Sequence, residues 1–272
     1  MKNRIVLLTL FLCINFITYA GNGNDPTGGR SASMGYASVS LIDFWSLQNN
    51  QAGLGYYDHI AAGIYYENRF LVKELSLKSG GFVLPTKSGT FGASFNYFGY
   101  SEYNESKAGI AYAKKFGEKF SAGIQLDYIQ TSIGEEYGNK GAVTFEIGLM
   151  SKITKHLTVG THIYNPIQPK LTDYNNERVP ANIRFGVSYL FSDKATLAAE
   201  VSQETNQKAF LKAGLEYHVI QPFYVRAGIS SNPALTTFGF GLELKNFNLD
   251  FASSIHPTLG YSPQVSFFWN FN

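Results

Sequence analysis

The sequence predicts an all-β protein: a transmembrane antiparallel up-and-down β-barrel of about fourteen strands, preceded by an N-terminal hatch segment. Three observations predict this fold. Apolar and polar residues alternate with a period of two from His59 to the end of the chain. Charged residues are only 15% of the chain and aromatic residues also reach 15%, whereas an ordinary soluble domain has about 25% charged residues. Every second connection between the alternating segments is a short polar turn.

The chain begins with a predicted signal peptide, residues 1–20. Lys2 and Arg4 supply positive charge, residues 5–17 are apolar, and Ala20 ends a small-residue cleavage site. The apolar run is shorter than the roughly 20 residues that a membrane-spanning helix needs. Removal of this peptide also removes the only cysteine, Cys13, so we expect no disulfide or thiol chemistry in the mature protein.

The predicted hatch segment, residues 21–57, follows the signal peptide and is rich in small residues without a strand period. The predicted barrel domain, residues 58–272, follows without a linker or charge run. The net charge is only +2, which gives no support for nucleic-acid binding.

The barrel segments are about 10 to 13 residues long, close to the roughly 9 to 11 residues of membrane strands and longer than the usual 5 or 6 of soluble strands. The predicted strands are residues 58–67, 72–84, 89–99, 106–115, 119–131, 140–153, 156–165, 180–191, 194–203, 208–219, 223–231, 236–245, 247–256 and 262–271.

Short turns alternate with longer connections, of which 134–140 and 167–178 are the longest. This asymmetry is typical of outer-membrane barrels, whose short turns are periplasmic. An even number of strands then places both termini in the periplasm. We therefore expect a multi-pass barrel in the outer membrane of a Gram-negative bacterium, in contact with outer-membrane lipid. A soluble β-sandwich also alternates and is the competing interpretation.

If the apolar face contacts lipid, the other face lines the lumen and carries a sparse set of charges. Unpaired charges in a confined lumen are costly, so we favour mutual pairing that holds the lumen shut over a polar conduit. In particular, Arg226 is expected between Glu216 and Glu243. The predicted lumenal polar network is Glu146, Arg184, Glu200, Lys212, Glu216, Arg226, Glu243 and Asp250.

The sequence offers no enzyme or metal signature, and we expect no catalysis, cofactor or metal site. No Gly-x-Ser-x-Gly motif occurs. None of the histidines lies in a nucleophile motif or at metal-ligand spacing. The histidines are His59, His156, His162, His218 and His256.

The N-terminal stretch carries a family resemblance. It contains Arg30-x-x-x-Met34-Gly35-x-Ala37, then Asp43, then Asn50-x-Ala52-Gly53-Leu54. This pattern resembles the start of the PorV/PorQ-like outer-membrane proteins, within the superfamily of FadL-type fatty-acid channels. Strand blocks such as 180–189 and 238–242 resemble that family as well. Two residues depart from its pattern: Tyr36 replaces a usual Gly, and Gln51 replaces a Pro, which is expected to loosen the turn.

The resemblance implies a fourteen-stranded barrel whose hatch enters the lumen from the periplasmic side. In that arrangement Arg30 would pair with Glu216 or Glu243, and Asn50 and Gly53 would form a tight turn. The alternative is a segment that only lies across the periplasmic mouth. The hatch residues are expected to be Arg30, Met34, Gly35, Asp43, Asn50, Gly53 and Leu54.

Two functions follow from the resemblance. The first is a non-catalytic accessory of the type IX secretion system, which would bind secretion-system proteins or secreted cargo. The second is a FadL-like passive channel for small hydrophobic compounds. The loops are short for a ligand receptor and the predicted lumen is polar, which favours the accessory.

Overall fold

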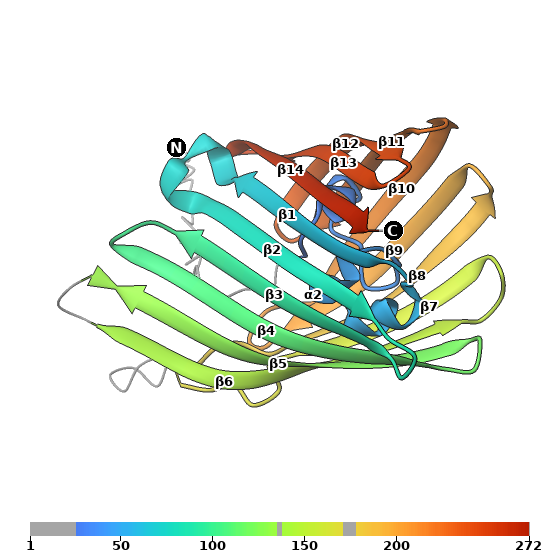
Figure 1. Ribbon diagram of the computed structural model, residues 1–272. Helices are drawn as coiled ribbons and strands as arrows, with labels where there is room; N and C mark the ends of the chain where they lie inside the picture. The colour runs from blue at the N-terminus through green and yellow to red at the C-terminus, as the bar shows by residue number, and fades with distance from the viewer. Residues whose placement is uncertain (1–25, 135–137, 171–177, 272) are drawn as a thin grey trace, which may run out of the picture.

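The computed structural model describes residues 26–134, 138–170 and 178–271 (Figure 1). The predicted signal peptide lies outside the described residues, as do parts of the two longest predicted connections, at 135–137 and 171–177.

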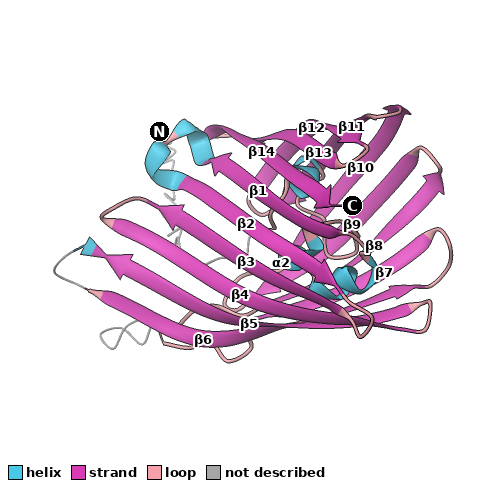
Figure 2. Cartoon of the chain, in the orientation of Figure 1, coloured by secondary structure: helices cyan, strands magenta, loops and turns pink. Residues whose placement is uncertain are grey.

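Fourteen antiparallel strands form one closed barrel, in which each strand pairs with its neighbours in sequence and β1 pairs with β14. This confirms the predicted fold class and excludes the two-sheet sandwich. Figure 2 shows strands around the whole wall, with the helical turns of the N-terminal segment enclosed by them. The strands are β1 Ile60–Asn68, β2 Ser76–Pro85, β3 Thr90–Gly99, β4 Tyr103–Phe116, β5 Phe120–Ile133, β6 Asn139–Lys152, β7 Leu157–Tyr164, β8 Asn182–Ser192, β9 Ala195–Glu204, β10 Phe210–Ile220, β11 Phe223–Ser231, β12 Ala234–Leu244, β13 Phe247–His256 and β14 Gly260–Phe271.

The barrel exterior is apolar and its interior is polar, as the alternation predicts. On β5, Ile124 is 52% exposed and Leu126 is 60% exposed, whereas Gln125 and Asp127 between and beside them are buried. A soluble protein buries its apolar face, so the reversed pattern matches a wall that contacts lipid.

The barrel begins and ends at the same rim. Ile60, the first residue of β1, is paired with Phe271, the last residue of β14. The short turns, such as the one between Phe116 and Phe120, lie at this rim as well. This arrangement is the one in which membrane barrels place short turns and termini together.

Helical turns lie in the N-terminal segment and in the β1–β2 connection. The N-terminal segment contains α1 Gly29–Ser33, α2 Ser46–Asn49 and η1 Gln51–Tyr56, and the β1–β2 connection contains η2 Arg69–Leu71 and η3 Lys73–Leu75. No described helix is long and apolar enough to cross a bilayer.

The start of the second predicted strand, at residue 72, is wrong. Lys73–Leu75, inside the predicted range, form the 3-10 turn η3, and just before it Phe70 and Leu71 have left-handed φ angles of 56° and 60°. The chain therefore makes two helical turns, and β2 begins only at Ser76.

Candidate functional site in the barrel lumen

The N-terminal segment, defined here as residues 26–57, lies inside the ring of strands (Figure 1). Nearly all of its residues up to Leu54 are buried. Its backbone donates hydrogen bonds to side chains in the middle of distant strands: Gly29 N to Ser266 Oγ at 2.9 Å and Gly35 N to Thr237 Oγ1 at 2.9 Å. The segment thus contacts inward-facing residues well below the rim of the barrel.

Arg30 joins this segment to β10. Its Nε and Nη2 donate to the two oxygens of Glu216 at 2.8 and 2.7 Å, and its Nη1 donates to Asp43 Oδ2 at 3.3 Å. Burial alone would lower the pKa of Arg30, but the carboxylates of Glu216 and Asp43 outweigh it and raise the pKa above its ordinary value. Arg30 is therefore a permanent cation held between the wall and a later part of its own segment.

Arg226 extends this group along the wall. It donates to Glu216 at 2.7 Å and to Asp250 Oδ1 at 2.5 Å. The prediction that Arg226 lies between Glu216 and Glu243 is therefore correct for Glu216 and wrong for Glu243, because Asp250 is the second partner. Glu243 lies nearer the rim, is exposed, and accepts a hydrogen bond from Tyr224 at 2.7 Å. Strand stagger explains the difference, because it places Asp250 beside Arg226.

Glu200 on β9 forms a second group. Arg184 donates to both of its oxygens at 2.8 and 3.0 Å, and Lys212 Nζ donates at 3.0 Å. The backbone N–H groups of Ser38 and Val39 each donate to Glu200 Oε2 at 2.9 Å. One buried carboxylate therefore binds two wall cations and the backbone of the segment.

Glu146 on β6 forms a third group, most of whose members sequence reasoning missed. Lys107 Nζ and Gln51 Nε2 each donate to Glu146 at 2.7 Å, and His162 Nε2 lies 3.0 Å from it. Lys107 and His162 both occupy inward positions of their strands, so the alternation contains the signal that would have identified them. The residues around Gln51 have no such alternation, because they form a helical turn.

Asn50 makes the predicted turn. Its backbone oxygen accepts from Gly53 N at 2.9 Å, its side-chain oxygen accepts from Ala52 N at 3.2 Å, and its Nδ2 donates to Val39 O at 2.7 Å. Gln51 stands where the pattern that this sequence resembles has Pro. It holds the turn against the wall by donating a hydrogen bond to Glu146, whereas a proline ring would restrict the backbone of the turn itself.

The Met34-Gly35-Tyr36 stretch also makes a sharp turn. Gly35 and Tyr36 have φ angles of 66° and 62°, in the left-handed region that glycine adopts at little cost. This explains why Gly is usual at both places in the pattern that the sequence resembles. Tyr36 is retained here with two polar contacts: Gln264 Nε2 donates to its hydroxyl at 2.8 Å, and Glu67 Oε1 lies 3.3 Å away.

The segment fits the wall most closely at inward-facing glycines. A Cβ atom at Gly148 would lie 2.1 Å from Asn50 Oδ1, and one at Gly214 would lie 2.4 Å from Met34 O. A methyl group at either place would force a neighbour to move, and at Gly214 that neighbour is the backbone of the segment, which cannot turn aside as a side chain can. We call the wall residues with contacts of this kind the glycine belt: Gly63, Gly81, Gly92, Gly123, Gly148, Gly160, Gly186, Gly214, Gly228 and Gly239.

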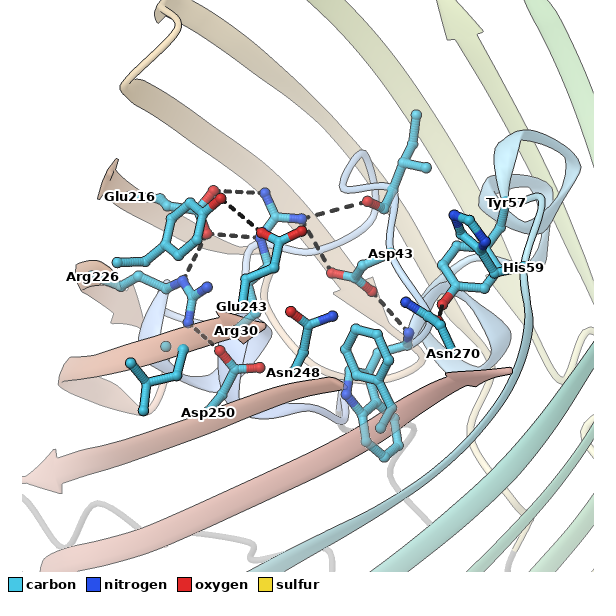
Figure 3. Close-up of a pocket in the computed structure, with 16 residues that line it drawn as sticks. Arg30, Asp43, Tyr57, His59, Glu216, Arg226, Glu243, Asn248, Asp250 and Asn270 are labelled. Atoms are coloured by element: carbon cyan, nitrogen blue, oxygen red, sulfur yellow. Dashed lines mark hydrogen bonds and ion pairs between the residues drawn. The ribbon is translucent and has the colours of Figure 1, made fainter. Parts of the chain in front are cut away.

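One sector of the lumen is less tightly filled. A cavity of about 320 Å³ lies between the segment and the wall formed by β10 to β14, and it is lined by Arg30 and Asp43 of the segment and by Glu216 and Asp250 of the wall, among others (Figure 3). Within residues 26–134, 138–170 and 178–271, no group of three acidic, histidine or cysteine side chains is placed to hold a metal ion.

Comparison by sequence finds no matching family model and no matching curated protein. Comparison of structures finds the Ralstonia pickettii toluene transporter TbuX, at 12% identity and a TM-score of 0.68, covering 92% of this chain and 100% of that one. The P. putida toluene transporter TodX matches at 14% identity and a TM-score of 0.68, with the same coverage. A Pseudomonas aeruginosa FadL homologue matches at 12% identity and a TM-score of 0.67, covering 90% of this chain and 98% of that one. The chain therefore has the barrel fold of FadL-type channels.

Proposed function

We propose that the protein is a non-catalytic outer-membrane channel for small hydrophobic compounds, and that residues 26–57 are its hatch, seen here in the closed position. The observation that carries the proposal is a segment enclosed by a barrel whose fold is that of two toluene transporters over 92% of this chain. The apolar exterior supports a membrane location, and the short turns at the rim where the barrel begins and ends support periplasmic termini.

The hatch can open only if contacts between it and the wall are broken. On the β5 to β8 side it is held by four glycines of the belt, by Glu146 and by the Asn50 turn; these glycines are Gly123, Gly148, Gly160 and Gly186. On the β10 to β14 side a cavity already separates part of it from the wall. We infer that the hatch moves first on the cavity side, where opening breaks the Arg30–Glu216 ion pair and the hydrogen bonds from Gly29 to Ser266 and from Gly35 to Thr237.

A PorV/PorQ-like accessory of the type IX secretion system is the second candidate. Close contact along the glycine belt suits a fixed stopper as well as a closed hatch. The β1–β2 connection also exposes Leu71 by 64% and Val72 by 40% at the outer rim, where a protein partner or cargo could dock.

A reversible lock on the hatch tests the channel function. In Ser33→Cys/Gly239→Cys, the Cβ of residue 33 lies 2.7 Å from the ideal Cβ of residue 239, so a shift of about 1 Å gives disulfide geometry. Toluene uptake would be measured in cells that lack other aromatic-hydrocarbon channels. The double variant is first shown to fold, because Gly239 belongs to the glycine belt. We then expect its uptake to be lost on oxidation and restored by reductant, and each single-cysteine variant to give the same uptake with and without reductant.

Gene deletion separates the two candidates. Loss of toluene uptake with an unchanged set of secreted proteins supports the channel. Unchanged uptake with loss of proteins from the cell surface would reject the channel in favour of the accessory.

A further inference from the structure

The cavity beside Arg30 has properties that a path for neutral hydrocarbons does not require. Its volume of about 320 Å³ falls at the lower end of the roughly 300 to 1,000 Å³ of small-molecule sites. Figure 3 shows side chains from the segment and from the β10–β14 wall converging on it. Both partners of the connection between hatch and wall, Arg30 and Glu216, line it.

The charges that line the cavity do not balance. Four carboxylates face two guanidinium groups, which leaves two negative charges at neutral pH. The carboxylates are Asp43, Glu216, Glu243 and Asp250, and the guanidinium groups are Arg30 and Arg226.

Glu243 carries much of this surplus. The hydroxyl of Tyr224 donates to it, and no cation pairs with it among the residues that the structure describes. The cavity therefore attracts positive charge at its rim.

The pKa of Tyr57, which also lines the cavity, responds to the same negative charges. Burial first, and then the charges of Asp43 and other carboxylates, Glu243 among them, raise the pKa of its phenol above the ordinary value. Its hydroxyl remains protonated and donates to Asn270 Oδ1 at 2.5 Å. The rim thus combines neutral hydrogen-bonding groups with carboxylates that have spare acceptor capacity.

Two aromatic side chains line part of the cavity. Trp45 and Phe268 line it, and each is packed against Phe44, with ring centroids 5.0 and 5.2 Å from that of Phe44. Trp45 is 1% exposed, and its indole N–H has no hydrogen-bond partner in the described part of the chain. An indole ring is the best aromatic partner for a cation.

We propose that this cavity binds a small organic amine, with its ammonium group at the Glu243 and Asp43 carboxylates and its apolar body against Trp45 and Phe268. Such a ligand is distinct from the neutral compounds of the proposed channel. Because the site includes Arg30 and Asp43, its occupant touches the connection between hatch and wall.

Trp45 also supplies the measurement. The sequence has two tryptophans, and the other, Trp269, is on the outer face with 38% exposure. The Trp269→Phe variant in non-ionic detergent therefore reports on Trp45 alone. Its fluorescence would be titrated with benzylamine, benzyl alcohol and benzoate, which share one ring and differ in charge.

We expect a saturable change with benzylamine, affinity at least about tenfold higher than for benzyl alcohol, and no binding of benzoate; tenfold corresponds to about 1.4 kcal/mol. Glu243→Gln should weaken benzylamine binding by a similar factor, while Glu118→Gln, in an exposed turn, should leave it unchanged.

Equal binding of benzylamine and benzyl alcohol, stronger binding of benzoate, or no saturable change would each overturn the proposal. The comparison of the three compounds is made on Trp269→Phe alone, so it stands even if Glu243→Gln fails to fold. Toluene uptake is measured separately, so absence of amine binding leaves the proposed channel intact, and absence of uptake leaves the amine site intact.

Discussion

Replacement of Glu216 by Gln should release the first half of the hatch. Glu216 accepts three hydrogen bonds from charged donors, at 2.8 and 2.7 Å from Arg30 and at 2.7 Å from Arg226. The Glu216 side chain is 8% exposed and that of Arg30 is 22% exposed, so solvent screens the pair only weakly. Gln keeps the shape of the side chain but removes the charge that both guanidinium groups share.

The free-energy cost of Glu216→Gln depends on which carboxylate partners Arg30 and Arg226 keep. Removing one partner of a buried ion pair costs about 3–5 kcal/mol. Arg30 keeps Asp43 at 3.3 Å and Arg226 keeps Asp250 at 2.5 Å, which places the loss near about 3 kcal/mol, the lower end of that range. Local opening of the segment should then become about a hundredfold more frequent, since each 1.4 kcal/mol is about a factor of ten.

Amide hydrogen exchange measured by mass spectrometry would detect this opening. Peptides from residues 26–45 should exchange about a hundredfold faster in Glu216→Gln, whereas peptides from β5 and Glu118→Gln should match the unchanged protein. The double variant Arg30→Gln/Glu216→Gln should lose less than the sum of the single variants, because the two residues share one interaction. Equal exchange in Glu216→Gln and the unchanged protein would refute the role of this pair in holding the hatch.

Three further substitutions have expected outcomes. Gly214→Ala should lower the yield of heat-modifiable folded barrel on gels, because its Cβ would lie 2.4 Å from Met34 O, whereas Gly80→Ala, with its nearest neighbour at 3.6 Å, should fold normally. Tyr36→Phe should lower the free energy of unfolding in urea by about 1 kcal/mol through loss of its hydroxyl contacts, and an unchanged midpoint would show that those contacts contribute nothing. Gln51→Pro should lower it by about 1–3 kcal/mol, because it removes a buried donor from a lumenal carboxylate; a stabilised protein would instead favour the rigid ring at this turn.

The barrel was predictable because lipid imposes a local rule. Every outward position must be apolar, so the alternation alone identifies strands and their faces, and all fourteen predicted strands overlap those observed. The start of β2 was not predictable, because nothing in the residue types of 69–75 indicates two 3-10 turns with left-handed backbone at Phe70 and Leu71.

The lumen was only partly predictable. Alternation identifies which side chains point inward, but the stagger between strands decides which of them meet, so Asp250 and not Glu243 lies beside Arg226. The Arg30–Glu216 pair was one of two expected partners and came from the family resemblance. The glycine belt was visible only as a small, polar inner face, since its purpose depends on the path of a segment with no period of its own.

The position of the N-terminal segment is the claim on which the other inferences depend, and disulfide mapping in intact outer membranes tests it most directly. Ser33→Cys should form a disulfide with Gly239→Cys on β12, where the ideal Cβ lies 2.7 Å from that of residue 33. It should form none with Gly92→Cys on β3, which faces Leu47 instead. A shift in mobility between reduced and unreduced unfolded protein reports the bond. Both double variants are first shown to fold by heat-modifiable migration on gels, because residues 239 and 92 belong to the glycine belt. In folded protein, cross-linking to residue 239 alone is the expected result, and cross-linking to residue 92, or to neither, would contradict a segment seated in the lumen as described.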